Sequence, residues 1–449
     1  MTAPPPAPAR QGGMSRRAVA GWCLYDWAMS AFNTVIGTFV FSVYFAKGIA
    51  PDESTGTQMW GQALGVAGIL VAVLSPVLGA IADRGGRRKP WLAAFTLLCV
   101  GLTALLWYAK PEPGWVLPAL LAVAAANVAF ELAGVFYNAM LPDVAPPSHV
   151  GRVSGWGWGL GYFGGLGALV LCLTLLIQTE APLFGLIPAE QSGGVRATAL
   201  LVAVWYALFA LPLFLLTPDR PGTGVPAGRA VREGLSTLAA TLREVRHRAD
   251  TVRFLVASAL WRDGINTVVQ FGGIFAAAAF GMSTPQIITF AILLNVTSGL
   301  GAAGFAWMDD RQGAKPTILI SLAGLMATGG AMLLVGTPWW SWAPSPGLPL
   351  DFTAEQQWLL VFGMGLGVFF GPAQAAGRSL MARLAPPGLE TEMFGLYALT
   401  GRMAGLIGPF AYGAATVAFD SQRAGMATVL VLFVAGFLLL LPVREPRRG

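Results

Sequence analysis

The chain has 449 residues, of which 55% are hydrophobic and only 11% are charged. Soluble domains carry roughly 25% charged residues, so this chain has too few charges to cover a water-facing surface and is predicted to be a polytopic membrane protein. The net charge of +6 does not indicate nucleic-acid binding, because the basic residues lie in short loops between apolar runs.

The sequence shows no pattern typical of a metal site, a disulfide or a cofactor site. Cys23, Cys99 and Cys172 fall inside apolar runs, where a free cysteine behaves as a small apolar residue. His149 and His247 lie far apart in polar loops. No catalytic triad or nucleotide-binding loop is visible, which argues against an enzyme and against ATP-driven transport.

The first 18 residues are rich in proline and basic side chains and are predicted to be disordered. The apolar run after them is too long for a signal peptide and has no small-residue cleavage site. A helix needs about 20 apolar residues to cross a bilayer, and runs of this kind occur twelve times. They are placed at 19–46, 58–82, 90–109, 115–140, 153–178, 197–216, 251–280, 284–308, 316–336, 355–380, 392–416 and 423–442.

Lysine and arginine gather in the loops on one side of these spans, which predicts that both termini are cytoplasmic in a cell (inner) membrane. Two spans open with helix-start signals: Ser283-Thr284-Pro285, and Thr353 followed by Gln356. The glycine-rich segment 155–167 predicts close helix packing rather than phosphate binding, because no Gly-Lys-Ser/Thr follows it.

The polar segment 217–250 divides the spans six and six. Its first part, "TPDRPGTGVPAG", has the composition of a flexible linker, whereas "RAVREGLSTLAATLREVRHR" predicts an amphipathic helix, either on the membrane surface or simply solvated. The fold class is therefore an all-α membrane protein with twelve transmembrane helices in two six-helix pseudo-repeats. The predicted units are the N-terminus 1–18, a first half 19–216, a cytoplasmic linker 217–250, a second half 251–442 and a cytoplasmic tail 443–449.

The two halves repeat the same short patterns. Asp83-Arg84-x-Gly86 corresponds to Asp310-Arg311-x-Gly313, and Ala145-Pro146-Pro147 corresponds to Ala385-Pro386-Pro387. The same register pairs Gly155 with Gly395, and Asn33-Thr34-Val35 echoes Asn266-Thr267-Val268. Parallel six-helix repeats are typical of secondary transporters whose site lies between the halves.

The loop "DRGGRRKPW" after the second span is the most specific short signal. Asp83 ends a helix beside the turn formed by Gly85 and Gly86, and Arg84, Arg87 and Arg88 present positive charge at the surface. A carboxylate bonded to arginines and to a neighbouring helix N-terminus predicts a latch between the halves on that side. The alternative is that these arginines only set topology. In the second copy Ala314 replaces the first arginine, which leaves the strength of a latch there open.

This D-R-x-G-R-R pattern resembles the hallmark loop of the major facilitator superfamily. The segments "LYDWAMSAFNT", "VFYNAMLPDV", "VSGWGWGLGYFGG", "WRDGINTV" and "GPAQAAGRSLMARLAPP" resemble more narrowly the vacuole-effluxer-like group, the bacterial relatives of the fungal autophagy-related vacuolar amino-acid effluxer. The similarity runs from about residue 20 to residue 415. It implies the major facilitator fold, transport by alternating access, and an amino acid or amino-acid-like substrate.

Ionisable residues inside spans are functional candidates by default. The five noted are Asp26, Glu131, Arg262, Asp263 and Arg402, and all five are alternatively structural ion pairs. Asp26 shares a helix face with Ser30 and Asn33, and Asp263 shares one with Asn266 and Gln270. The family resemblance implies that these faces line a central cavity. Arg402 is expected to hold a substrate carboxylate or to neutralise Glu131.

The resulting hypothesis is proton-coupled transport of a small-molecule substrate by a monomer in contact with membrane lipid, with Asp26, Glu131 or Asp263 as the proton carrier. Sodium coupling would use similar oxygen ligands and stays an alternative. A sugar or drug carrier is the second hypothesis, and a non-transporting membrane receptor or scaffold is the third. No metal, cofactor or nucleic acid is expected.

Overall fold

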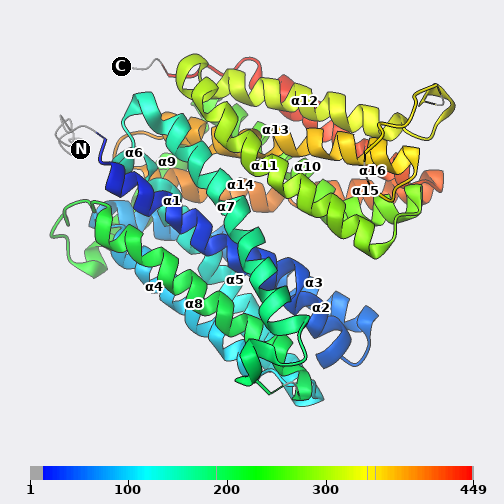
Figure 1. Ribbon diagram of the computed structural model, residues 1–449. Helices are drawn as coiled ribbons and strands as arrows, with labels where there is room; N and C mark the ends of the chain where they lie inside the picture. The colour runs from blue at the N-terminus through cyan, green and yellow to red at the C-terminus, as the bar shows by residue number, and fades with distance from the viewer. Residues whose placement is uncertain (1–13, 189, 341, 349, 447–449) are drawn as a thin grey trace.

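The computed structural model describes residues 14–188, 190–340, 342–348 and 350–446. Over these ranges the chain is helical and contains no strand, as the apolar runs predict. The helices form two bundles that lie close together at the end where both termini are found and diverge toward the opposite end (Figure 1). We call these the termini end and the far end. The expectations for residues 1–13 and 447–449 lie outside the described residues.

The first bundle contains the helices up to α8. Its first helix, α1 (Arg16–Ala31), starts at Ser15, whose hydroxyl accepts the backbone N–H of Ala18. The chain then passes through two π-helical stretches, Phe32–Phe39 and Phe45–Ile49, on either side of α2 (Phe41–Tyr44). The remaining helices are α3 (Glu53–Gly85), α4 (Lys89–Leu105), α5 (Val116–Ala139), α6 (Leu141–Val144), α7 (Val150–Cys172) and α8 (Gly193–Leu216).

The second bundle follows the linker helix α9 (Ala227–Val245). It consists of α10 (Ala249–Phe280), α11 (Thr284–Gln312), α12 (Ala314–Leu334), α13 (Ala354–Leu384), α14 (Glu390–Ala404), α15 (Ile407–Phe419) and α16 (Gln422–Leu440). Both predicted helix starts are confirmed. The backbone N–H groups of Ser283 and Thr353 donate to the side chains of Gln286 and Gln356, which completes a capping box at each position.

Ten helical segments within the described ranges are long and apolar enough to cross a bilayer. The two predicted spans outside this set are 251–280 and 392–416. The first coincides with α10, which carries Arg262 and Asp263 near its middle. The second is broken at Gly405 and Leu406 into two short helices, α14 and α15. With these two counted, the helices follow the twelve predicted runs in order.

The two bundles meet along a seam in which α14 packs on α3 and α11 packs on α7. The matched glycines of the two repeats lie at these contacts. A Cβ atom on Gly155 in α7 would lie 2.6 Å from the carbonyl oxygen of Ala302 in α11, and one on Gly395 in α14 would lie 2.6 Å from that of Ser75 in α3. A glycine is required at both places because the helix backbones approach too closely for any side chain.

Parts of the predicted N-terminus, linker and tail are held in place by specific contacts. Residues 16–18 form the first turn of α1 rather than part of a disordered N-terminus. The start of the 217–250 linker is held by Asp219 and Arg220, and the tail is held by Glu445, through contacts described below.

The amphipathic linker helix α9 packs on the termini end of α3. A Cβ atom on Gly234 would lie 3.0 Å from the backbone of Ile81, and Arg84 donates to the hydroxyl of Thr237. The helix is therefore packed against the protein, and it is not simply a solvated helix or one that contacts only lipid. Its other face presents exposed apolar side chains, namely Val231, Leu235 and Leu242.

We predict that Gly395→Ala destabilises the folded protein by about 1–3 kcal/mol, because the added methyl group must push α14 away from α3. The matched control is Gly304→Ala in α11, where an added Cβ meets nothing within 4 Å. Thermal unfolding of both variants in the same detergent measures the difference. Equal midpoints would show that the seam tolerates side chains at Gly395.

Candidate functional site: charged clusters between the two halves

The loop between α3 and α4 holds the first charged cluster. Asp83 Oδ2 accepts the backbone N–H of Glu392 at 2.9 Å, and Asp83 Oδ1 accepts the hydroxyl of Thr391 at 2.6 Å. Both partners lie in the first turn of α14, so a carboxylate of the first half caps a helix of the second half, where the partial positive charge of the helix end favours an anion. Arg88 Nη2 lies 3.1 Å from Asp83 Oδ1. These are the two contacts that the loop motif predicts.

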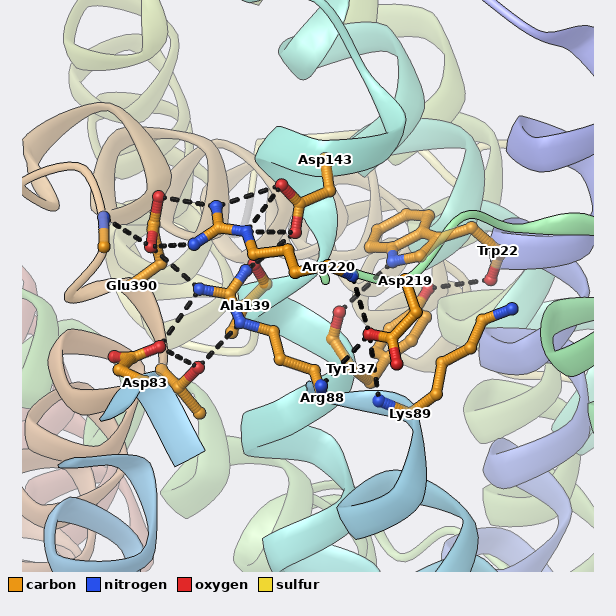
Figure 2. A network of polar contacts seen from close by, with 12 residues as sticks. Trp22, Asp83, Arg88, Lys89, Tyr137, Ala139, Asp143, Asp219, Arg220 and Glu390 are labelled. Atoms are coloured by element: carbon orange, nitrogen blue, oxygen red, sulfur yellow. Dashed lines mark hydrogen bonds and ion pairs between the residues drawn. The ribbon is translucent and has the colours of Figure 1, made fainter. Parts of the chain in front are cut away.

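Arg88 is almost completely buried, with 1% of its side chain exposed, and every nitrogen of its guanidinium has a partner. Besides Asp83, it contacts Asp143 Oδ2 and Glu390 Oε2, each at 2.8 Å. It also donates to the hydroxyl of Thr391 and to the carbonyl of Ala139 (Figure 2). One arginine therefore joins α3, α5 and α6 of the first half to α14 of the second.

The linker supplies a second arginine to the same cluster. Arg220 donates to both carboxylate oxygens of Glu390, at 2.8 and 2.9 Å, and its Nε lies 3.0 Å from Asp143 Oδ1 (Figure 2). Burial lowers the pKa of Arg220, but the hydrogen bonds to Glu390 and the charge of Asp143 outweigh it and raise that pKa above its ordinary range. Arg220 therefore stays charged, and three carboxylates share two arginines in this cluster.

The second half builds the corresponding cluster with a different charge arrangement. Asp310 accepts the backbone N–H groups of Gly151 and Arg152 at 2.9 and 3.3 Å, and it pairs with the Arg152 side chain. Gly151 and Arg152 lie in the first turn of α7. Asp310 therefore caps a first-half helix as Asp83 caps a second-half helix. Arg152 supplies the positive charge beside Asp310. Arg87, the arginine that Ala314 replaces, is exposed and takes no part in the first cluster.

A neighbouring pair of acids caps helices within each half. Asp219, after α8, accepts the backbone N–H groups of Arg88 and Lys89 at the start of α4. Glu445, after α16, accepts those of Ala314 and Lys315 at the start of α12. Arg383 joins this second cluster by contacting Asp309 and Glu445, each at 2.7 Å. Its counterpart in the repeat is Asp143, so the charges at that position are exchanged between the halves.

Deeper in the bundle, Asp26 of α1 contacts Arg378 of α13 at 2.9 Å, across the two halves. Arg378 also donates to the amide oxygen of Asn138 and to the hydroxyl and carbonyl oxygens of Ser154. The Tyr137 hydroxyl donates to Asp26 at 2.8 Å. The guanidinium lies 4.6 Å from the ring centre of Trp22. Arg378 lies inside the predicted span 355–380 and is a further intramembrane charge besides the five named from the sequence.

A separate ion pair joins Glu131 of α5 to Arg402 of α14. It also crosses between the halves, but both of its side chains are partly exposed, whereas the carboxylate of each inter-half pair described above is at most 12% exposed. The exposed side-chain fractions are 27% for Glu131 and 36% for Arg402, against 1% for Arg88 and 4% for Arg378. Of the two expectations for Arg402, neutralisation of Glu131 is what the structure shows.

Asp263 of α10 belongs neither to the charged clusters nor to the pair Glu131–Arg402. Its Oδ2 accepts the backbone N–H of Gly408 at 2.6 Å, in the first turn of α15, where the predicted eleventh span is broken. Its Oδ1 is buried and has no hydrogen-bond partner among the described residues. The neighbouring Arg262 points elsewhere: it donates to the carbonyl of Tyr397 and stacks on that ring at 4.3 Å.

The remaining predicted residues lie apart from these contacts. Asn266 and Gln270 are exposed, whereas Asp263 is 1% exposed, so the structure does not bring this predicted stripe together on one surface. Asn33 is exposed in the π-helical stretch Phe32–Phe39, and Arg87 and Arg311 are exposed at the termini end. Gly86 and Gly313 both have positive φ, at 84° and 117°, and allow the turns that follow Asp83 and Asp310.

Taken together, the polar side-chain contacts between the halves are concentrated toward the termini end. Among the ion pairs between the halves in the described ranges, Glu131–Arg402 is the exception, because the others belong to the clusters around Asp83, Asp310 and Arg378. The structure is thus closed at the termini end.

The chain matches the family model described as "Vacuole effluxer Atg22 like" over residues 57–448. It is 27% identical to YxiO of Bacillus subtilis, an uncharacterized MFS-type transporter, in an alignment that covers 94% of both chains. It is 24% identical to autophagy-related protein 22 of Coccidioides immitis, covering 85% of this chain and 71% of that protein.

Solved structures of the major facilitator superfamily (MFS) share its fold. The transporter FucP in the outward conformation superposes with a TM-score of 0.73 at 13% identity, covering 96% of this chain and all of that chain. The proton:xylose symporter XylE gives a TM-score of 0.71 at 16% identity, covering 96% of each chain. These likenesses show the fold, and the family match covers most of the sequence. The chain therefore belongs to the vacuole effluxer Atg22-like family and is a multi-pass transporter of the major facilitator superfamily.

Proposed function

We propose that this protein is a proton-coupled secondary transporter of an amino acid or amino-acid-like solute, working by alternating access between the halves 19–216 and 251–442. The observation that carries the proposal is the contrast between two kinds of inter-half contact. Buried charge clusters close the termini end, while the pair Glu131–Arg402 remains accessible between the halves. A closed gate beside a reachable polar pair is the arrangement that a carrier needs in one of its two states.

The proposed orientation places the termini end in the cytoplasm of a cell (inner) membrane. The basic loops that predict this orientation belong to the same end as the clusters around Asp83 and Asp310. In this orientation the structure is the state closed to the cytoplasm, and opening requires Asp83 and Asp310 to leave the helix ends that they cap.

The pair Glu131–Arg402 suits a substrate that carries both charges. The carboxylate of an amino acid would take the place of Glu131 on Arg402, and its ammonium group would take the place of Arg402 on Glu131. This exchange keeps both side chains paired, so the cost of desolvating them is offset in the loaded and the empty state alike. A neutral sugar or an apolar drug offers no such replacement.

Asp263 is the proposed proton carrier. Asp26 is held by Arg378 and Glu131 by Arg402, whereas Asp263 forms no ion pair with the described residues. A proton can bind Oδ1 of Asp263 while Oδ2 keeps the N–H of Gly408. Neutralising the carboxylate weakens its attraction to the positive N-terminus of α15, which gives the proton a means of acting on that half-helix.

We predict that each common L-amino acid that raises the unfolding temperature of the purified wild type loses its effect in Arg402→Gln and Glu131→Gln. The physical reason is that each variant leaves one charge of the zwitterion without its partner. Stabilisation by sugars or cationic drugs alone would contradict the substrate class, and no response to any solute would favour a receptor or scaffold.

We further predict that Asp263→Asn in proteoliposomes abolishes accumulation of the stabilising amino acid driven by a pH gradient but retains exchange across a membrane without a gradient. Asp420→Asn is the matched control. This acid follows the last residue of α15, at the opposite end of that helix from Gly408, and it is not the N-cap of a helix. If a sodium gradient alone drives accumulation, or if Asp263→Asn still concentrates substrate, the proton role is wrong.

A third prediction concerns Arg378. Replacing it with Gln leaves the Asp26 carboxylate buried without a cation, which is expected to destabilise the protein by about 3–5 kcal/mol. The double variant Asp26→Asn/Arg378→Gln removes the orphaned charge and is expected to recover part of this loss. Chemical unfolding of wild type, both single variants and the double variant measures the coupling. Additive losses would show that the two side chains do not form an energetic pair.

A further inference from the structure

A cavity of about 680 Å³ lies between α1, α7 and α11. Four of its lining residues on α7 are Trp156, Gly159, Leu160 and Phe163. At 100° per residue, Trp156, Leu160 and Phe163 lie on the side of α7 opposite Ser154, whose hydroxyl and carbonyl oxygens bind Arg378 inside the bundle. The cavity therefore opens on the outside of the protein, where the side chains of Leu160 and Ala20 are exposed. It is separate from the inter-half charge clusters.

The cavity has the length of one membrane leaflet. It begins at Arg16, the first residue of α1, and reaches Phe163, thirteen residues after the start of α7 at Val150. At 1.5 Å per residue this is roughly 20 Å, compared with about 15 Å for half of the hydrocarbon core plus part of an interface. The cavity thus extends from the termini end to about the middle of the bilayer.

The lining is apolar except at the termini end. Gly159, Gly299 and Ala303 are small residues that let α7 and α11 approach closely. They also line the cavity, where their lack of large side chains leaves space. Water in such a cavity would lack hydrogen-bond partners, whereas hydrocarbon would fill it without loss. Arg16 is the one charged residue of the lining, and it forms no hydrogen bond or ion pair with the described part of the chain.

We propose that this cavity binds one anionic phospholipid from the leaflet at the termini end, with an acyl chain against Leu160 and Phe163 and the phosphate at Arg16. An arginine at the interface that has no partner among the described residues attracts an anionic headgroup, and the apolar cavity beside it accepts the acyl chain. The site spans the seam, because α7 belongs to the first half and α11 to the second. The lipid would therefore contact both halves, whatever solute the protein transports.

The test compares phosphatidylglycerol with phosphatidylcholine of the same acyl chains, added to the delipidated protein in detergent and followed by native mass spectrometry. Wild type is expected to retain one phosphatidylglycerol in preference to phosphatidylcholine. Arg16→Gln is expected to bind phosphatidylglycerol about fivefold more weakly, as the loss of one arginine contact at a membrane surface predicts. Arg17→Gln is the matched control, because it removes the same charge one residue away, outside the cavity lining.

A second variant tests the chain pocket rather than the headgroup. Ala20→Phe fills the cavity from an exposed position on α1 and is expected to lose the retained lipid while remaining folded and monodisperse. Three results would overturn the proposal: no preference between the two lipids in the wild type, equal weakening by Arg16→Gln and Arg17→Gln, or undiminished retention by Ala20→Phe. The first two results would mean that lipid binds without specificity around the basic residues of the termini end.

Discussion

The arrangement of the two halves depends on carboxylates that bind helix N-termini across the seam. Asp83 caps α14 and Asp310 caps α7, so each half places one acid on a helix of the other. The first turn of a helix presents backbone N–H groups that have no partner within the helix, and a carboxylate satisfies them while interacting with the helix dipole. Because both contacts lie at the same end, they hold that end closed and leave the far end free to separate.

The arginines offset the cost of burying these carboxylates in a low-dielectric environment. Arg88 and Arg220 are shared among three acids, and Arg152 serves Asp310, so these four acids are paired and hydrogen-bonded. Buried pairs of this kind add little net stability but are costly to disrupt singly. The clusters are therefore suited to switching as a unit, with the closed and open states near in free energy.

The sequence predicts the parts of this site that have a local signature. Asp83, Arg88 and the repeat at Asp310 follow from one short loop motif, whereas no local pattern distinguishes Arg378, Arg383 or Glu445. Their partners come from distant elements, and the exchange of Asp143 for Arg383 between the halves hides their correspondence. Helical periodicity places Asp263 with Asn266 and Gln270, but the break at Gly405 brings the N-terminus of α15 against Asp263 and buries it, while Asn266 and Gln270 stay exposed. That break depends on packing, which a residue pattern does not contain.

The most direct test of this account is the distance between the halves at both ends in the variant Asp83→Asn/Asp310→Asn. Spin labels at positions 148 and 312 report the termini end, and labels at 57 and 284 report the far end; all four positions are exposed, and the native cysteines are buried. Removing the two capping charges is expected to lengthen the 148–312 distance and shorten the 57–284 distance relative to wild type. Unchanged distances at both ends would contradict the claim that these two carboxylates hold the gate closed.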